Sequence, residues 1–218
     1  MPNASTSFFG WVAFLLQKYG MLFLRGTGMT LLIALTGTVL GFALGLLVAI
    51  IRTIALPEKK KAGSNAGVIV KRGLLRFVHM LMNVYIQVFR GTPMIVQAVV
   101  IYYGAQYAGV FMDTTFAAVF IISINTGAYM AEIIRGGIVS VDRGQFEAAH
   151  AIGMTHWQTM TTVVLPQAIR NILPSVGNEL IVNIKDSSVL NVISVSELFF
   201  QACRAPRSAT RRALPLCP

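Results

Sequence analysis

Two carboxylates stand out because they interrupt the apolar C-terminal third of the chain. Glu179 and Asp186 are seven residues apart, which is about two helical turns and places them on nearly one face of a helix. Ionisable groups at membrane depth are costly and usually face a cavity or a partner. These side chains either line a path for a ligand that carries an ammonium or guanidinium group, or form a structural pair in which Lys185 neutralises Asp186.

Arg90, Thr92 and Pro93 stand at the start of an uncharged run and could receive an anion. Proline is tolerated at a helix start because its missing N–H is spare there, and the free backbone donors and the helix dipole favour negative charge. A ligand carboxylate, a lipid phosphate and a simple helix cap all remain open as the function of this group.

Polar residues also interrupt the apolar run that follows Asp113. Asn125 and Tyr129 are four residues apart, so they share a helix face and either line a cavity or bond a neighbouring helix. Glu132 and Arg135 are three residues apart, a spacing that predicts an ion pair within one helix.

The segment between the third and fourth apolar runs has the pattern of a helical elbow. Its marker residues are Glu147, Ala148, Ala149, Gly153, Leu165 and Pro166. We predict a short amphipathic helix, a turn at Gly153, a second helix from near Thr155, and a proline that introduces the next span. Such an elbow would present a rigid surface to a cytoplasmic partner; an ordinary connecting loop is the alternative.

Other chemistry finds no support in the sequence. His150 and His156 lack the His-Glu-x-x-His spacing of a zinc site, and no Gly-x-Ser-x-Gly nucleophile pattern occurs. A phosphate-binding loop requires a Gly-Lys pair, which is absent from the sequence. We therefore expect no catalytic residue, metal or cofactor, and any energy from ATP must come from another chain.

The elements that position these residues are predicted to be membrane helices. Of the 218 residues, 55% are hydrophobic and 12% charged, whereas soluble domains carry about 25% charged residues. A membrane crossing needs roughly 20 apolar residues. We predict four crossings in an all-α membrane protein, with Leu74–Phe89 lying in the membrane interface before the second. These crossings are Gly26–Ile51, the run between Arg90 and Asp113, Thr114–Ala131 with an extension towards Arg135, and Leu165–Ile184.

Three glycines recur at four-residue spacing inside the first predicted crossing. Gly37, Gly41 and Gly45 lie on one face of a helix, and small residues there let a neighbouring helix approach closely. Simple tolerance of glycine in a membrane helix is the alternative.

The formal net charge of +10 comes from basic clusters beside apolar runs. Seven basic residues fall within 52–76, against only Lys18 and Arg25 before the first crossing. The positive-inside rule places this stretch and residues 136–160 in the cytoplasm and the N-terminus outside. Residues 1–20 are expected to form an interfacial segment rather than a cleaved signal. No pattern for nucleic-acid binding is present.

Several stretches, in this order, resemble the polar-amino-acid permeases of the ABC importers. The elbow spacing is similar to the coupling loop of those permeases, and the resemblance covers roughly residues 20–202. The stretches are Arg90-Gly91-Thr92-Pro93 with Gln97, Asn125-Thr126-Gly127-Ala128-Tyr129 with Glu132 and Arg135-Gly136, Leu165-Pro166-Gln167-Ala168, Gly177-Asn178-Glu179 and Lys185-Asp186-Ser187-Ser188.

The resemblance implies a helical bundle of the type I ABC importer permease kind in the bacterial cytoplasmic membrane. Glu147, Ala149 and Gly153 match the positions that dock on a separate ATP-binding subunit. The family also implies a second permease subunit and an extracytoplasmic solute-binding protein, with substrate passing as two permeases rock between outward- and inward-facing states. A secondary transporter driven by an ion gradient is the alternative, and the sequence does not choose among polar amino acids.

The last residues differ from the family pattern. Family members usually continue into one more membrane helix, whereas residues 203–218 are rich in Ala, Pro, Arg and Ser and include both cysteines, Cys203 and Cys217. This stretch is too short and too polar to cross a membrane. We expect an aberrant basic tail from a frameshift or truncated reading, with a variant tail bound to anionic lipid as the alternative.

Overall fold

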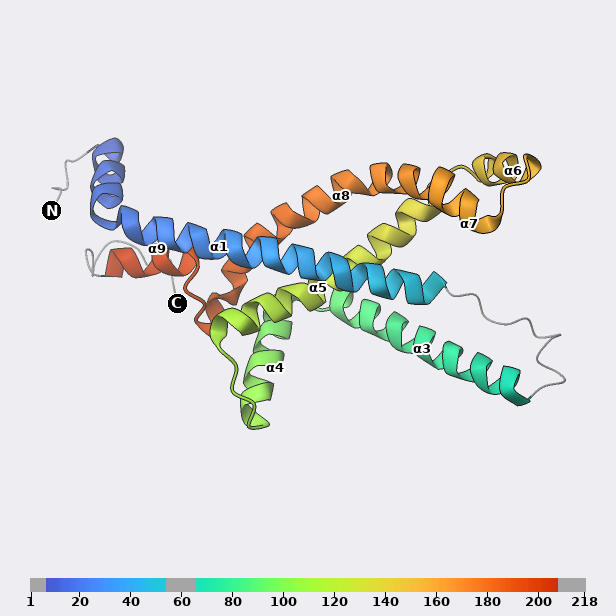
Figure 1. The fold of residues 1–218 in the computed structure, drawn as a ribbon. Helices are drawn as coiled ribbons and strands as arrows, with labels where there is room; N and C mark the ends of the chain where they lie inside the picture. Colours follow the sequence, from blue (N-terminus) through green and yellow to red (C-terminus); the bar gives the residue numbers. More distant parts are fainter. Residues whose placement is uncertain (1–6, 54–65, 208–218) are drawn as a thin grey trace.

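The computed structural model describes residues 7–53 and 66–207, and within these ranges the secondary structure is helical, without strands. Figure 1 shows long helices that cross one another, with the short α6 and α7 at one end. This confirms the predicted all-α fold. The helices are α1 (Phe8–Thr53), α3 (Ala66–Gly91), α4 (Met94–Tyr107), α5 (Thr114–Val139), α6 (Arg143–Ala151), α7 (His156–Gln158), a π-helix (Thr159–Val164), α8 (Leu165–Asp186), a 3₁₀-helix (Ser187–Ile193) and α9 (Leu198–Arg207).

Helix α1 includes the first predicted crossing but begins well before it. The helix runs for 46 residues, so residues 8–20, expected as a separate interfacial segment, are continuous with it. Figure 1 shows these first turns at a steep angle to the rest of the helix. By length and composition α1 and α5 can each cross a membrane, and α3 with α4 forms a third, bent candidate.

The glycine face of α1 packs directly on α5. A Cβ atom added to Gly41 would lie 2.6 Å from Cβ of Thr126, and additions at Gly37 and Gly45 would collide with Ile122 and Met130. The two backbones approach this closely because glycine has no side chain, so the predicted packing role is confirmed.

The second predicted crossing is wrong in its position. The chain breaks between Gly91 and Met94, and α3 and α4 meet there at 113°. Helix α4 has 14 residues, about 21 Å, which is shorter than the hydrocarbon core of a bilayer. Leu74–Phe89, expected as an interfacial prelude, is the middle of the 26-residue helix α3. The break follows from Pro93, which disfavours a helical conformation in the residue before it.

The predicted basic loop over residues 52–76 is largely helical where it is described. Helix α3 begins at Ala66, and residues 54–65, with Lys59, Lys60 and Lys61, lie outside the described residues. Figure 1 shows the end of α1, the start of α3 and the α6–α7 elbow at the same end of the molecule. That arrangement agrees with the prediction that both connections lie on one side of the membrane.

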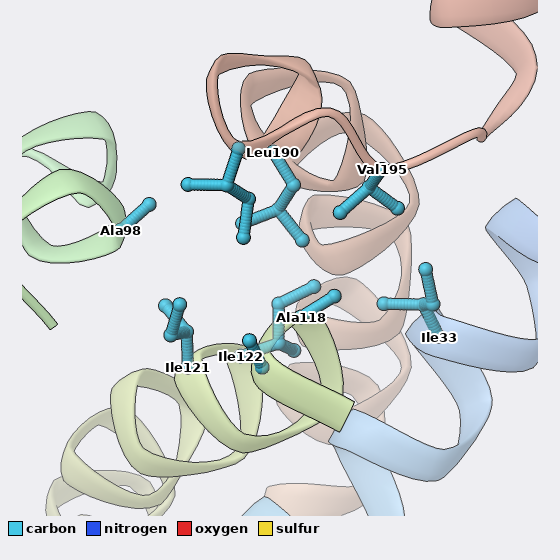
Figure 2. Packing of buried hydrophobic residues seen from close by; sticks show 9 residues of the cluster. Ile33, Ala98, Ala118, Ile121, Ile122, Leu190 and Val195 are labelled. Carbon is cyan, nitrogen blue, oxygen red and sulfur yellow. The ribbon is translucent and has the colours of Figure 1, made fainter. Parts of the chain in front are cut away.

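Helix α5 begins at a capped N-terminus and runs through the centre of the fold. The Asp113 carboxylate accepts hydrogen bonds from the backbone N–H groups of Thr115 (2.8 Å) and Phe116 (3.2 Å). The helix extends past Glu132 towards Arg135, as predicted, and continues four residues further to Val139. Figure 2 shows its buried side chains Ala118, Ile121 and Ile122 meeting residues of α1, α4 and the segment after α8.

A π-helix joins the elbow to α8. In Thr159–Val164 the backbone N–H of Leu165 reaches back five residues to the Met160 carbonyl. Pro166, in the first turn of α8, has no N–H to donate. The side-chain amide of Gln167 donates to the Val163 carbonyl at 2.9 Å, which adds a hydrogen bond where the backbone lacks one. The sequence analysis did not foresee this π-helix.

Helix α8 covers the stretch of the fourth predicted crossing and ends at Asp186 instead of Ile184, but among the described helices it is not one that is long and apolar enough to cross a membrane. The 3₁₀-helix then leads to Ser194, whose φ is 64°, and to α9, which packs against α1 near Gly26. The predicted change of character at residue 203 is not seen in the backbone, because α9 continues to Arg207. Residues 208–218, including Cys217, lie outside the described part of the chain.

Candidate functional site

A cavity of about 650 Å³ lies where the α3–α4 break, α5 and the C-terminal half of α8 meet. Its lining joins three parts of the chain that are distant in sequence. The lining residues are Thr92, Pro93, Met94, Ile95, Asn125, Tyr129, Asn178, Glu179, Val182, Asp186 and Val189. Five of the predicted substrate-path residues are therefore brought together, namely Thr92, Asn125, Tyr129, Glu179 and Asp186.

Arg90 and Lys185 are placed differently. Arg90 does not line the cavity, but its guanidinium carbon lies 5.4 Å from the ring centre of Tyr129, which does. This is the geometry of a cation–π contact. Lys185 is exposed and absent from the lining, so the structure does not bring it to the other predicted residues.

The start of α4 gives one end of the cavity a partial positive charge. Pro93 is the N-cap, and the N–H groups of Val96 and Gln97 bond its carbonyl. The N–H groups of Met94 and Ile95 precede this first helical bond and point out of the helix start. Both residues line the cavity, so the backbone and the helix dipole favour an anion at this end.

Buried amides hold the α3–α4 break in place. The Gln97 side-chain nitrogen lies within hydrogen-bonding distance of three acceptors. These are the Phe89 carbonyl (2.9 Å), the Thr92 carbonyl (3.0 Å) and the Thr92 hydroxyl (2.8 Å). The Asn125 amide donates to the Gln97 side-chain oxygen at 2.9 Å. Asn125 thus both lines the cavity and bonds a neighbouring helix, so the two alternatives of the sequence analysis occur together.

Two carboxylates of α8 also line the cavity. Glu179 is only 7% exposed, and Asp186 lies further along the same face of α8 and also lines the cavity. Arg90 and Asp186 are the charged groups that act electrostatically on Glu179. Among the described residues no ion pair joins Lys185 to Asp186, so the structural-pair alternative lacks its expected contact.

The predicted pair between Glu132 and Arg135 is present, and it has a third member. Arg135 donates from Nε to Glu132 Oε2 at 2.9 Å. The other carboxylate oxygen accepts from Arg52 at the end of α1. The sequence could not reveal this contact, since Arg52 lies 80 residues before Glu132.

The elbow has the predicted parts. Helix α6 is capped by Asp142, Gly153 forms the turn with a φ of +82°, and Thr155 caps α7 in a capping box with Gln158. A side chain at a φ of this sign is strained, which explains the glycine. On α6 the side chains of Glu147 and Ala148 are exposed.

The elbow is fixed to the ends of α5 and α8. Ala149 is 4% exposed, and a cluster of Val141, Val164 and Ala168 packs with Phe146 and Met160. Leu165 and Pro166 stand exposed at the root of the elbow.

Sequence analysis missed several residues of the site. Asn178 was quoted in a motif without a role, and Val182 and Val189 carried no signal because they are ordinary apolar residues. Asn183 does not line the cavity, but it is a buried polar residue beside it on α8, in an apolar segment four positions after Glu179. A polar residue at this helical spacing from Glu179 is the sequence signal that could have identified Asn183.

Comparison with known proteins places the chain in a family. The family model described as "Binding-protein-dependent transport system inner membrane component" matches residues 63–204, and the chain belongs to this family. Similar proteins include a putative glutamine transport system permease protein GlnP of Rickettsia prowazekii, 35% identical over 192 residues, which cover 87% of this chain and 79% of the relative.

Two further relatives agree. The glutamine permease GlnP of Escherichia coli K12 is 39% identical over 81% of this chain and 73% of its own length. The L-cystine transport system permease protein TcyB of Bacillus subtilis is 39% identical over 76% of this chain, which spans 64% of that relative.

Solved structures support the same fold. A crystal structure of an amino acid ABC transporter with histidines matches with a TM-score of 0.79 and 36% identity, covering 95% of this chain and 86% of that one. An inward-facing structure of the MetNI methionine ABC transporter matches with a TM-score of 0.66 at 17% identity, covering 91% of this chain and 85% of that one, which supports the fold alone.

The chain is therefore a permease subunit of an ABC importer, embedded in a membrane by its apolar helices. An importer of this class works with ATPase and partner components. The alternative of a secondary transporter driven by an ion gradient is not favoured by the family match or by the structural matches.

Proposed function

We propose that this subunit passes a polar L-amino acid across the bacterial cytoplasmic membrane and holds it in the cavity between α4, α5 and α8. The observation that carries the proposal is that one cavity is lined both by the N-terminus of a helix and by two carboxylates. The α4 N-terminus, with Arg90 behind Tyr129, favours a carboxylate, and Glu179 with Asp186 favours an ammonium or guanidinium group.

The size and the relatives fit this assignment. The cavity of about 650 Å³ lies within the roughly 300–1,000 Å³ range of small-molecule sites. Relatives named for glutamine and cystine transport carry the same kind of cargo. A zwitterion fits better than a simple cation because the same cavity is lined by groups that favour an anion and by groups that favour a cation.

Energy enters through the elbow. We propose that an ATP-binding subunit docks on the exposed face of α6 around Glu147, with Ala148, Ala149, Gly153, Leu165 and Pro166 maintaining its shape. The packing of Val164 and Ala168 under the elbow would carry force into α8, which lines the cavity. A second permease subunit, an extracytoplasmic solute-binding protein and surrounding lipid complete the assembly, and this chain itself catalyses no reaction.

The test removes each carboxylate charge while keeping the side-chain shape. We expect Glu179→Gln and Asp186→Asn each to raise the KM for the transported amino acid by at least about tenfold, because a buried charge partner is lost. Uptake into liposomes containing the complete complex gives KM and kcat. Lys185→Gln is the matched control, since Lys185 is exposed and outside the cavity, and its KM should stay unchanged.

The outcome against the proposal is equally clear. If both carboxylate variants assemble, hydrolyse ATP at the basal rate and keep the parental KM, then the cavity is not the substrate site. A rise in KM that also appears in Lys185→Gln would show that general surface charge, and not the cavity, sets the affinity.

A further inference from the structure

One polar connection crosses the apolar core of the bundle, and the transport mechanism above does not use it. The Asn183 side chain is 2% exposed. Its oxygen accepts from the Thr126 hydroxyl of α5 at 3.0 Å, and its amide nitrogen donates to the Thr38 hydroxyl of α1 at 2.8 Å. Asn183 therefore ties α8 to two other helices at once.

Both threonine hydroxyls of this connection form hydrogen bonds. The Thr38 hydroxyl accepts from Asn183 and donates to the Ala34 carbonyl of its own helix at 2.7 Å. Thr126 is fully buried and its hydroxyl donates to Asn183. In a membrane such interhelical hydrogen bonds stabilise a particular arrangement of helices. An amide bonded at both ends fixes rotation of α8 about its axis as well as its distance from α1 and α5.

That rotation decides which residues of α8 face the cavity. Asn183 is four residues after Glu179 and three before Asp186, so all three lie within a narrow sector of the helix. Val182 lines the cavity, whereas its neighbour Ile181 is 52% exposed on the outside of the bundle. A turn of one residue, about 100°, would bring Ile181 to the position of Val182 and move the carboxylates away from the cavity.

We propose that Asn183 is a positioning residue for transport: its hydrogen bonds to Thr126 and Thr38 set the rotation of α8 that presents Glu179 and Asp186 to the substrate. The inference rests on the proposed function for its effect on affinity, while the orientation of α8 can be tested without any substrate.

Asn183→Leu is a suitable variant because it leaves no hydroxyl stranded. Thr38 keeps its bond to Ala34, and the Thr126 hydroxyl can turn to the carbonyl four residues earlier, as the Thr36 and Thr53 hydroxyls do. Thr126→Val removes the same connection from the other side, and Thr126→Ser should restore it. Thr36→Val is the matched control, since Thr36 bonds its own helix but lies on the exposed surface.

The first measurement reads the rotation directly. In the full complex, with Cys203→Ser and Cys217→Ser, single reporters Val182→Cys and Ile181→Cys are treated with a membrane-impermeant methanethiosulfonate reagent. The reagent should label position 182 much faster than position 181. We expect the ratio of the two rates to fall by about threefold to tenfold in Asn183→Leu and Thr126→Val, the range that an interhelical hydrogen bond in a membrane supports. The ratio should stay constant in Thr126→Ser and Thr36→Val.

The second measurement reads transport. Asn183→Leu should raise KM with little change in kcat, and this rise should disappear when Glu179→Gln and Asp186→Asn are both already present, because misplacing absent charges costs nothing. An unchanged labelling ratio in Asn183→Leu overturns the inference, as does a lower ratio with an unchanged KM. If Glu179→Gln alone leaves KM unchanged, the proposed substrate site fails, whereas the labelling ratio still tests the orientation of α8.

Discussion

At the residue scale, the polar side chains within the bundle take part in specific contacts. Glu132 receives two arginines, Gln97 closes the α3–α4 break, and Asn183 joins three helices. Sequence spacing predicts contacts within one helix, such as Glu132 with Arg135, because helix geometry is periodic. It does not predict Arg52 with Glu132 or Asn183 with Thr38, which depend on how separate helices meet.

Asp113 provides a test of pH dependence at a site outside the crossings. Hydrogen bonds from the backbone N–H groups of Phe116 and Thr115 lower the pKa of Asp113 below its usual value. A carboxyl with a depressed folded-state pKa stabilises the fold above its unfolded-state pKa, and that stability is lost as the pH falls through the folded-state pKa. The charged cap of α5 should therefore be fully effective near neutral pH.

We expect Asp113→Ala to lower the thermal unfolding midpoint at pH 7 and to have a smaller effect once the pH is below the depressed pKa. Thermal unfolding of the purified protein in detergent across an acid pH series measures this difference. An equal destabilisation by Asp113→Ala at every pH would show that the capping charge is not responsible.

At the scale of elements, the sequence predicts helices better than it predicts their breaks. The start of α5 agrees with the sequence because the capping Asp113 marks the beginning of the apolar run, whereas the helix continues beyond the charged Glu132 and Arg135 to Val139. The run between Arg90 and Asp113 is equally uncharged, but the helix stops inside it at Pro93. The hydrophobicity of a segment indicates whether it is buried away from water. It does not indicate in which direction the chain continues after a proline, so it could not predict the α3–α4 break.

The glycine face of α1 makes a second prediction at this scale. Gly41→Leu should separate α1 from α5, because even a Cβ atom would collide with Thr126, and overpacking costs about 1–3 kcal/mol or more. Gly28→Leu is the matched control in the same helix, since nothing lies within 4 Å of a Cβ there. Thermal unfolding in detergent should show a clear loss for Gly41→Leu alone, and equal losses in both variants would contradict the packing role.

At the scale of the whole molecule, sequence motifs identify the class of protein but not the shape of its cavity. The sequence predicted Thr92, the pair Asn125 and Tyr129, and the pair Glu179 and Asp186 in three separate segments, and the fold brings them together. The apolar lining residues could not be added from sequence, because an apolar side chain in a membrane helix looks the same whether it faces lipid, another helix or a cavity.

The exposed face of the elbow leads to a prediction about how this subunit associates with the ATP-binding subunit. Glu147 is exposed, so Glu147→Ala should leave this chain folded but weaken its association with the ATP-binding subunit. Gln145→Ala on the same helix is the control, because Gln145 is also exposed and lies about 200° around the helix. Co-purification with the ATPase and substrate-stimulated ATP hydrolysis should fall only in Glu147→Ala. Normal association in Glu147→Ala would place the docking contact elsewhere.

The π-helix at Thr159–Val164 has a consequence for how such an elbow could move. In a π turn the backbone hydrogen bond joins residues five apart, whereas in an α turn it joins residues four apart, so the π turn contains one extra residue. If that surplus residue were released into regular α-helix, α8 would turn by about 100° and shift by about 1.5 Å relative to the elbow. The six residues Thr159–Val164 could thus let α8 take up one defined rotation and translation relative to the elbow.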